Sequence, residues 1–158
     1  MHKTKIDLTE DKRSALIDVL NQRLADAADL KSQAKQAHWN VKGMHFIALH
    51  ELFDRVATAA EEHTDLIAER ITTLGGTAFG TVRQAAHKSS LAEYPLEITD
   101  GTAHVDALSS ALADFGNKIR ADIDRTGEIG DQHTADLFTE ISRETDKNLW
   151  FVEAHIQA

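Results

Sequence analysis

The stretch HFIALHELFDRVATAAEEHTDLIAERITTL, residues 45–74, decides the fold, because apolar side chains recur along it every three or four residues. That spacing places them on one side of an α-helix. Gly75-Gly76 follows directly and predicts the end of this helix. The side chains that we expect to face a core are Phe46, Leu49, Phe53, Val56, Ala60, Ile67, Ile71 and Leu74.

Three further long helices are predicted on either side of this one. The predicted helices span residues 9–38, 45–74, 102–125 and 132–155, with a short helix at 82–87 inside a crossover at 77–100. Thr9 is the expected cap of the first helix. Turns are expected at residues 40–43 and around Gly127 and Gly130. The expected core positions outside residues 45–74 are Leu16, Leu20, Leu24, Ala27, Leu30, Ala34, Leu108, Leu112, Phe115, Ile119, Ile123, Leu137, Phe138, Ile141, Leu149, Val152 and Ile156.

Two helical hairpins joined by one long crossover have the connectivity of a ferritin-like four-helix bundle. Other four-helix topologies fit the same pattern nearly as well. We therefore predict an all-α fold, with one ferritin-like domain over residues 1–158 that includes a short N-terminal extension at residues 1–8. A chain of 158 residues is long enough for one domain with a substantial core.

Composition narrows the class of function. The net charge of −9 disfavours nucleic-acid partners, because an acidic surface repels phosphates and attracts cations. Cysteine is absent, whereas nine histidines and 26 acidic residues offer ligands for divalent metals. No signal-peptide pattern or membrane-length apolar run is present, so a cytoplasmic location without membrane contact is expected.

Four potential metal ligands lie on the central predicted helix, namely His50, Asp54, Asp65 and Glu69. The members of each pair, His50 with Asp54 and Asp65 with Glu69, are four residues apart and share a helix face. At about 100° per residue, the four ligands centre roughly 140° away from the core stripe. They are therefore predicted to point out of the bundle.

The two pairs cannot hold one ion on a single helix, because Asp54 and Asp65 are separated by roughly 16 Å at about 1.5 Å per residue. They are, however, symmetric about a point between Ala59 and Ala60. An identical helix laid antiparallel across this face would bring His50 and Asp54 of one chain to Asp65 and Glu69 of the other. The small residues at 57–60 would favour close approach, and such a two-fold contact is the commonest kind between identical subunits.

His38 ends the first predicted helix and can fold back beside His50. The combined set would be two imidazoles and one carboxylate from one subunit and two carboxylates from the other. Mixed nitrogen and oxygen ligands suit iron(II), and also zinc or manganese. The competing interpretation is a solvated acidic helix face without chemistry, and from geometry alone the two are about evenly matched.

These residues also resemble a known family. The motifs HWNVKG at 38–43, FIALHELFD at 46–54, HTDLIAER at 63–70 and DKNLWFVEAH at 146–155 are similar to those of the Dps family, the mini-ferritins named as DNA-binding proteins from starved cells. The similarity extends over nearly the whole chain.

The resemblance implies a hollow homo-oligomer, a dodecamer in the family, with a two-iron ferroxidase site at each end of every two-fold contact. His38, His50 and Asp54 would come from one subunit, and Asp65 and Glu69 from its mate. It implies that iron(II) is oxidised with hydrogen peroxide in preference to oxygen, followed by storage of ferric mineral. Trp39 would sit beside the site as an electron donor, with a packed interface aromatic as the equal alternative.

Other residues have open interpretations. Glu51, Glu61 and Glu62 are candidates for mineral nucleation, although exposed helix glutamates usually have no specific role. Glu128, Asp131 and Asp136 lie where the family has acidic entry pores, and Asp131 can equally be a helix cap. We expect His63 to face the core or an interface, and Trp150 to pack.

Four other functions fit the sequence less well. DNA binding is expected to be weak or absent, because only Lys3 and Lys5 precede Asp7 and no basic cluster lies near Ala158. A zinc hydrolase would need a second histidine where Asp54 stands. A conventional ferritin would need Glu-x-x-His motifs, which the sequence lacks. A helical scaffold without chemistry would not explain the symmetric ligand pairs.

Overall fold

A computed structural model describes residues 1–157 and contains five helices. They are α1 (Glu10–Asn40), α2 (Phe46–Thr73), α3 (Val82–Lys88), α4 (Gly101–Ile129) and α5 (Gln132–Glu153). No strand forms among these residues, apart from one isolated bridge between Lys42 and Asp100. The predicted all-α fold is confirmed.

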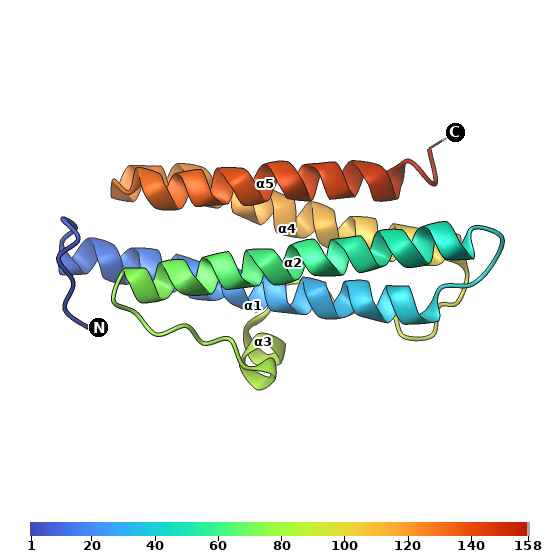
Figure 1. The fold of residues 1–158 in the computed structure, drawn as a ribbon, viewed down its shortest axis with the longest axis horizontal. Coiled ribbons are helices and arrows are strands. Elements are labelled where there is room, and N and C mark those ends of the chain that lie inside the picture. Colours follow the sequence, from blue (N-terminus) through green and yellow to red (C-terminus); the bar gives the residue numbers. More distant parts are fainter. Residues whose placement is uncertain (158) are drawn as a thin grey trace.

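Helices α1 and α2 form one antiparallel hairpin, and α4 and α5 form the other. Figure 1 shows that α2 ends at one end of the bundle and α4 begins at the opposite end, so the crossover runs along its length. The short helix α3 lies in this crossover and packs on α1. This is the ferritin-like connectivity that the sequence predicted.

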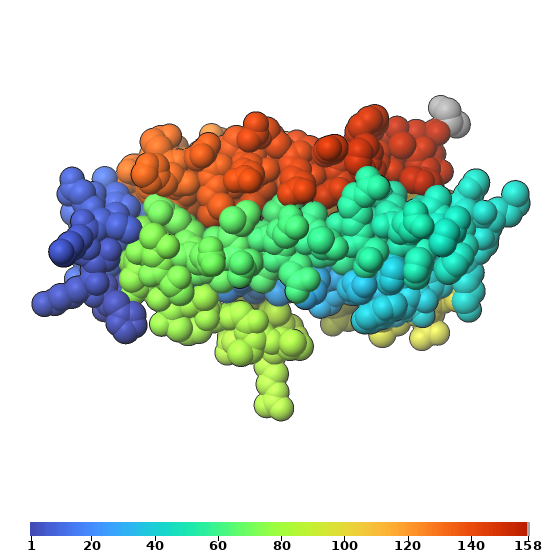
Figure 2. Space-filling view, viewed as in Figure 1, coloured from blue at the N-terminus to red at the C-terminus, as the bar shows by residue number. Residues whose placement is uncertain are grey.

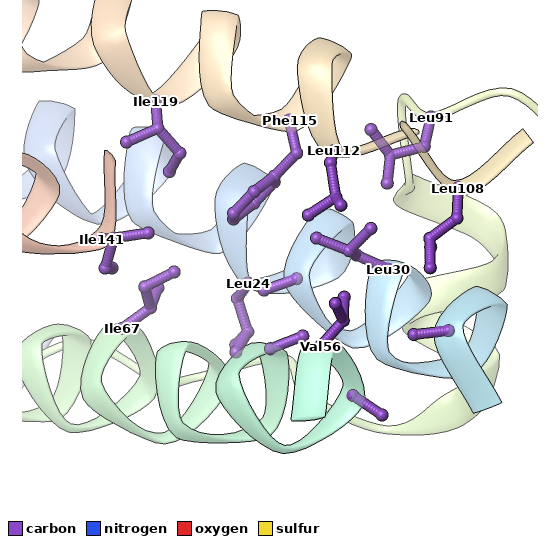
Figure 3. Packing of buried hydrophobic residues seen from close by; sticks show 14 of the residues in the cluster. Leu24, Leu30, Val56, Ile67, Leu91, Leu108, Leu112, Phe115, Ile119 and Ile141 are labelled. Carbon is purple, nitrogen blue, oxygen red and sulfur yellow. The ribbon is translucent and has the colours of Figure 1, made fainter. Parts of the chain in front are cut away.

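The core lies between the two hairpins and is filled by side chains from all four long helices (Figure 3). Phe53, Phe115 and Phe138 are completely buried, as are Leu16 and Leu20. Two of the predicted core residues are exposed: Phe46, in the first turn of α2, and Ile156, beyond the end of α5. Helical periodicity fixes the buried face of a helix, but it does not show how far the neighbouring helices extend to cover it.

Helix ends agree with the prediction except at the turn between α4 and α5. Gly127 was predicted to lie in this turn but is inside α4, and only Gly130 ends the helix, with a left-handed φ of 96°. Asp131 is the cap of α5, and its carboxylate accepts a hydrogen bond from the His133 amide. Thr9 caps α1 as predicted, and Gly75 ends α2 with a φ of 84°.

The N-terminal segment lies against the end of α2 (Figure 2). The His2 amide donates to the Gly75 carbonyl at 2.7 Å, and the Arg13 guanidinium donates to the Leu74 carbonyl at 2.9 Å. A side chain at Gly75 would collide with the His2 carbonyl, since an added Cβ would lie 2.5 Å from that oxygen. Lys3 and Lys5 are exposed beside this contact.

Largely buried charged side chains of α1 hold both the crossover and α4 in place. The Asp26 carboxylate on α1 is fully buried and accepts the Ser90 amide at 2.6 Å. Arg23 pairs with Asp26 at 2.6 Å and with Asp122 of α4 at 2.8 Å. Burial raises the pKa of Asp122 even though Arg23 acts against it. This network fixes the position of α4 against α1.

Candidate metal centre

His38 and His50 form a compact pair where the first hairpin turns. Their rings stack with centroids 3.7 Å apart and planes at 20°. His38 Nδ1 lies 2.7 Å from the His50 carbonyl oxygen, and His50 Nδ1 lies 2.8 Å from the His38 carbonyl oxygen. The predicted return of His38 to His50 is therefore present, and each ring is held by the backbone of the other residue.

This reciprocal bonding determines which ring nitrogen can bind a metal. A carbonyl oxygen only accepts hydrogen bonds, so each Nδ1 must carry the proton. The Nε2 atom of each ring is then left with its lone pair, which is the form that binds metal ions. Because both rings are already held in place, less side-chain entropy is lost when a metal binds. The pair is a preformed set of two nitrogen donors.

Asp54 lies one turn further along α2, and its carboxylate is half exposed. The Lys35 ammonium of α1 donates to its Oδ1 at 2.6 Å. The hydrogen bond from Lys35 is the main reason that the pKa of Asp54 lies below its ordinary value, so the carboxylate is charged and able to bind a cation. Lys35 therefore occupies Oδ1, one of the two oxygens of this carboxylate. Sequence reasoning did not identify Lys35, although its position three residues before His38 places both on one side of α1.

Asp65 and Glu69 lie at the other end of the outward face of α2, and both are exposed. Neither carboxylate forms an ion pair with any residue in the described range 1–157. Among those residues, no group of three or more histidine or acidic side chains is close enough to hold a metal ion within one chain. The structure thus places the predicted ligands in two separate sets on the same outward face.

Several large apolar side chains close to His38 and His50 in the sequence are exposed on the surface. Trp39 is 67% exposed, Ile47 62% and Met44 99%. The Lys35 ammonium lies 5.8 Å from the centre of the Trp39 ring, and the Phe46 ring lies 5.1 Å from that of His50. Exposed apolar clusters of this kind mark contact surfaces.

The small-residue stretch at 57–60 only partly fits the prediction. Ala57, Ala59 and Ala60 are buried within the chain itself, and only Thr58 is exposed. Their small size lets the other helices of the same bundle approach α2. The outward face at the midpoint is therefore formed by Thr58 and its polar neighbours.

Asp131 is a structural residue and not a free pore carboxylate. It is buried, caps α5 and pairs with Arg70 at 2.7 Å. Burial acts to raise its pKa, but the hydrogen bonds from Thr134 and Arg70 dominate and the pKa is lowered. Glu128 and Asp136 are exposed nearby.

The other acidic candidates differ from one another. Glu61 pairs with Lys31 at 2.5 Å. Glu51 and Glu62 line a groove between α2 and α5 that also includes Asp54. These two carboxylates therefore lie in the same groove as Asp54, which is one turn along α2 from His50.

His63 faces the core as predicted, and only 2% of its surface is exposed. Its Nε2 lies 2.9 Å from Glu144 of α5. Burial lowers the pKa of His63 despite this neighbour. Trp150, which was predicted to pack, is 60% exposed within one chain and contacts Phe151. Periodicity could not separate packing inside a chain from a surface left open for a neighbour.

The chain is similar in sequence to known ferritin-like proteins. The family model for the ferritin-like domain matches residues 17–158. The chain is 47% identical over 156 residues to the DNA protection during starvation protein of Agrobacterium fabrum, covering 99% of this chain and 96% of that protein.

No helix of residues 1–157 combines the length and apolar character needed to cross a membrane.

Solved structures agree with this relationship. Mycobacterium smegmatis Dps superposes with a TM-score of 0.94 at 30% identity, covering 99% of this chain and 96% of that chain. Dps from Vibrio cholerae, described as a member of a broad superfamily of ferritin-like diiron-carboxylate proteins, superposes with a TM-score of 0.91 at 25% identity, covering 99% and 98%.

Proposed function

The chain belongs to the Dps family of ferritin-like proteins, and from this premise we propose that it is a ferroxidase that oxidises iron(II) at sites shared between two subunits and stores the ferric product. The iron-binding, diiron-carboxylate character of this fold superfamily supports the proposal. The observation that carries it is the stacked pair of His38 and His50, oriented by reciprocal backbone bonds beside the ionised Asp54.

Each proposed site takes two iron(II) ions as substrate. His38, His50 and Asp54 of one subunit provide two nitrogen donors and a carboxylate, while Asp65 and Glu69 of a second subunit complete the oxygen ligands. This mixed set suits iron(II), and zinc or manganese can take its place. Two-fold symmetry creates two equivalent sites per contact. The exposed apolar residues around Trp39 supply area for that contact.

Peroxide is the oxidant that we propose, with oxygen as the slower alternative. Two iron(II) ions that react together supply both electrons that reduce a peroxide to water, so this paired reaction releases no hydroxyl radical, whereas a single iron(II) ion reacting alone does release it. Trp39 is adjacent to His38 and exposed, so we propose it as an electron donor to stray oxidants. Glu51 and Glu62, in the groove that includes Asp54, are the proposed first acceptors of ferric product. We propose that the assembly is a hollow dodecamer in the cytoplasm.

The experiment is iron(II) oxidation under anaerobic conditions, started with peroxide and followed by ferric absorbance. Asp54→Ala and Glu69→Ala should each lose the fast phase. Asp18→Ala, an exposed acid on α1 away from the outward face of α2, should keep it. A fast phase that survives in both ligand variants would refute the assignment.

DNA protection through direct binding is the second candidate, and the names of the relatives favour testing it. We propose that such binding is weak or absent near neutral pH. The net charge is −9, and the N-terminal segment with Lys3 and Lys5 is held against the end of α2 by the bond from His2 to Gly75. A gel shift with duplex DNA at several salt concentrations checks this, since phosphate contacts give a steep dependence on salt.

A further inference from the structure

Tyr94 and His104 form a second chemically distinctive pair, apart from the candidate ligands. Tyr94 lies in the crossover and His104 in the first turn of α4. The phenol oxygen lies 2.7 Å from Nδ1 of the imidazole, and the two rings are nearly parallel at 18°. Tyr94 is the single tyrosine of the chain.

The surroundings determine the direction of this hydrogen bond. His104 is 1% exposed, and burial lowers its pKa, so the ring is neutral at neutral pH. Burial also raises the pKa of the Tyr94 phenol, so the phenol keeps its proton. A neutral ring with its proton on Nε2 lets the phenol donate to Nδ1. Backbone groups of Asn40 and Ile98 lie beside the ring and favour its protonated form. Nε2 itself makes no well-aligned hydrogen bond.

We propose that Tyr94 and His104 form an electron-donor site that reduces one-electron oxidants of the hydroxyl-radical class. In this step the phenol gives one electron to the oxidant, the O–H bond of Tyr94 breaks, and the proton moves to Nδ1 of His104. The products are a neutral tyrosyl radical, an imidazolium and hydroxide from the hydroxyl radical. The source of the oxidant rests on the proposed function, because iron(II) that reduces peroxide by a single electron produces it.

The structure supports both halves of this step. A buried phenol that loses an electron without a base would become a buried cation, which is costly. Here the proton has an acceptor at 2.7 Å. The imidazolium that forms is stabilised by the Asp100 carboxylate and by the backbone of Asn40 and Ile98. Asn40, whose backbone lies beside His104, is the last residue of α1, two residues after His38, so the pair lies near the end of α1 that carries His38.

A purely structural role would be to fasten the crossover to α4, and the test must separate the two. The metal-free protein is exposed to a photogenerated ruthenium(III) tris-bipyridine oxidant, and the near-ultraviolet band of the neutral tyrosyl radical is followed in time. Tyr94→Phe should abolish the band. His104→Gln keeps a hydrogen-bond acceptor but no base, and should slow radical formation by roughly 10²-fold, the lower range for a positioned base. The exposed His87→Gln is the matched control and should leave the rate unchanged.

Deuterium oxide provides a measurement that needs no variant. The wild-type rate should fall in deuterium oxide, because the transferred proton is exchangeable. An unchanged rate in deuterium oxide, an equal rate in folded His104→Gln, or no tyrosyl radical in the wild type would each overturn the proposal.

A second arm uses iron(II) and peroxide with detection by electron paramagnetic resonance. A radical signal that disappears in Tyr94→Phe would support the link to iron chemistry. Its absence in wild type that oxidises iron normally would overturn that link, whereas failure of the wild type to oxidise iron at all would instead refute the proposed function. The photochemical arm contains no iron, so the two failures are distinguishable.

Discussion

The two ends of the outward face of α2 carry similar ligand types but differ in how they are organised. At one end, His50 is stacked on His38 and Asp54 is held by Lys35. At the other end, Asp65 and Glu69 are exposed and form no ion pair within the described part of the chain. The two imidazoles are therefore already oriented within one chain, while no contact within the described residues fixes the two distant carboxylates, which under the proposed function are positioned by a second subunit. We therefore expect the histidine end to bind iron(II) first.

Loss of a ligand from either end is the largest expected effect. His50→Ala should lower the affinity for iron(II) by more than about 100-fold, because loss of an outer-shell partner alone typically costs 10–100-fold. Glu69→Ala should lower the metal affinity of the assembled protein but not that of an isolated subunit. Titration calorimetry with zinc in place of iron(II) measures the affinity of each variant, at protein concentrations that favour either the assembly or the isolated subunit. Equal losses in the isolated subunit would remove the distinction between the ends.

The inner face of α2 provides a contrast that depends on pH. The pKa of His63 is lowered by burial, so the unfolded chain binds a proton that the folded chain resists. Its contribution to stability is present above the unfolded pKa of about 6.5 and is lost as the pH falls through that value toward the folded one. Melting temperatures should therefore be lower at acidic than at neutral pH.

His63→Gln should reduce this difference between acidic and neutral pH, whereas the exposed His87→Gln should not. His104 shifts in the same direction for the same reason, so part of the pH dependence should remain in the His63 variant. An identical pH dependence in wild type and His63→Gln would contradict the assignment.

Replacement of Lys35 is expected to have a smaller effect on the histidine end. Lys35→Met removes the ammonium that competes with metal for Asp54. An exposed ion pair contributes about 0.2–1 kcal/mol, so affinity for a divalent ion should increase by about 1.5- to 5-fold. Lys31→Met is the matched control, because Lys31 pairs with Glu61 outside the site. A fall in affinity would show that Lys35 supports the site instead of competing for it.

Removal of an acid from the free end should have the smallest effect on the fold. Asp65→Ala removes no ion pair and no buried group in the chain, so the subunit's free energy of unfolding should change by less than about 0.5 kcal/mol. Urea unfolding of the isolated subunit measures this change. A loss of several kcal/mol would mean that Asp65 already has a structural role in one chain.

The sequence predicted the bundle and the outward ligand face because both follow from helical periodicity. Leu49, Phe53 and Val56 repeat on one side, and His50 and Asp54 repeat on another. The reciprocal bonds of His38 and His50, and the pairing of Lys35 with Asp54, depend on how two helices meet. One helical pattern does not contain that information.

Contacts between distant parts of the chain also decide the open cases. Asp131 was predicted to be either a pore acid or a helix cap, and the structure shows the cap, paired with Arg70 far away in the sequence. Phe46 and Ile156 satisfied the apolar pattern but remain exposed on a single chain, and Trp150, which was expected to pack, is exposed as well. A hydrophobic repeat reports that a side chain will be covered, without reporting whether the cover comes from its own chain or from a neighbour.

Complementation between subunits tests the shared site most directly. Asp54→Ala and Glu69→Ala chains with different affinity tags are produced together, and oligomers that carry both tags are isolated. Each mixed two-fold contact retains one intact site, made from the His50 end of the Glu69→Ala chain and the Asp65 end of the Asp54→Ala chain. Random pairing should restore about a quarter of the wild-type fast phase of iron oxidation, since about half of the contacts are mixed. Oligomers proven to contain both chains that remain as inactive as either variant alone would contradict a site shared between subunits.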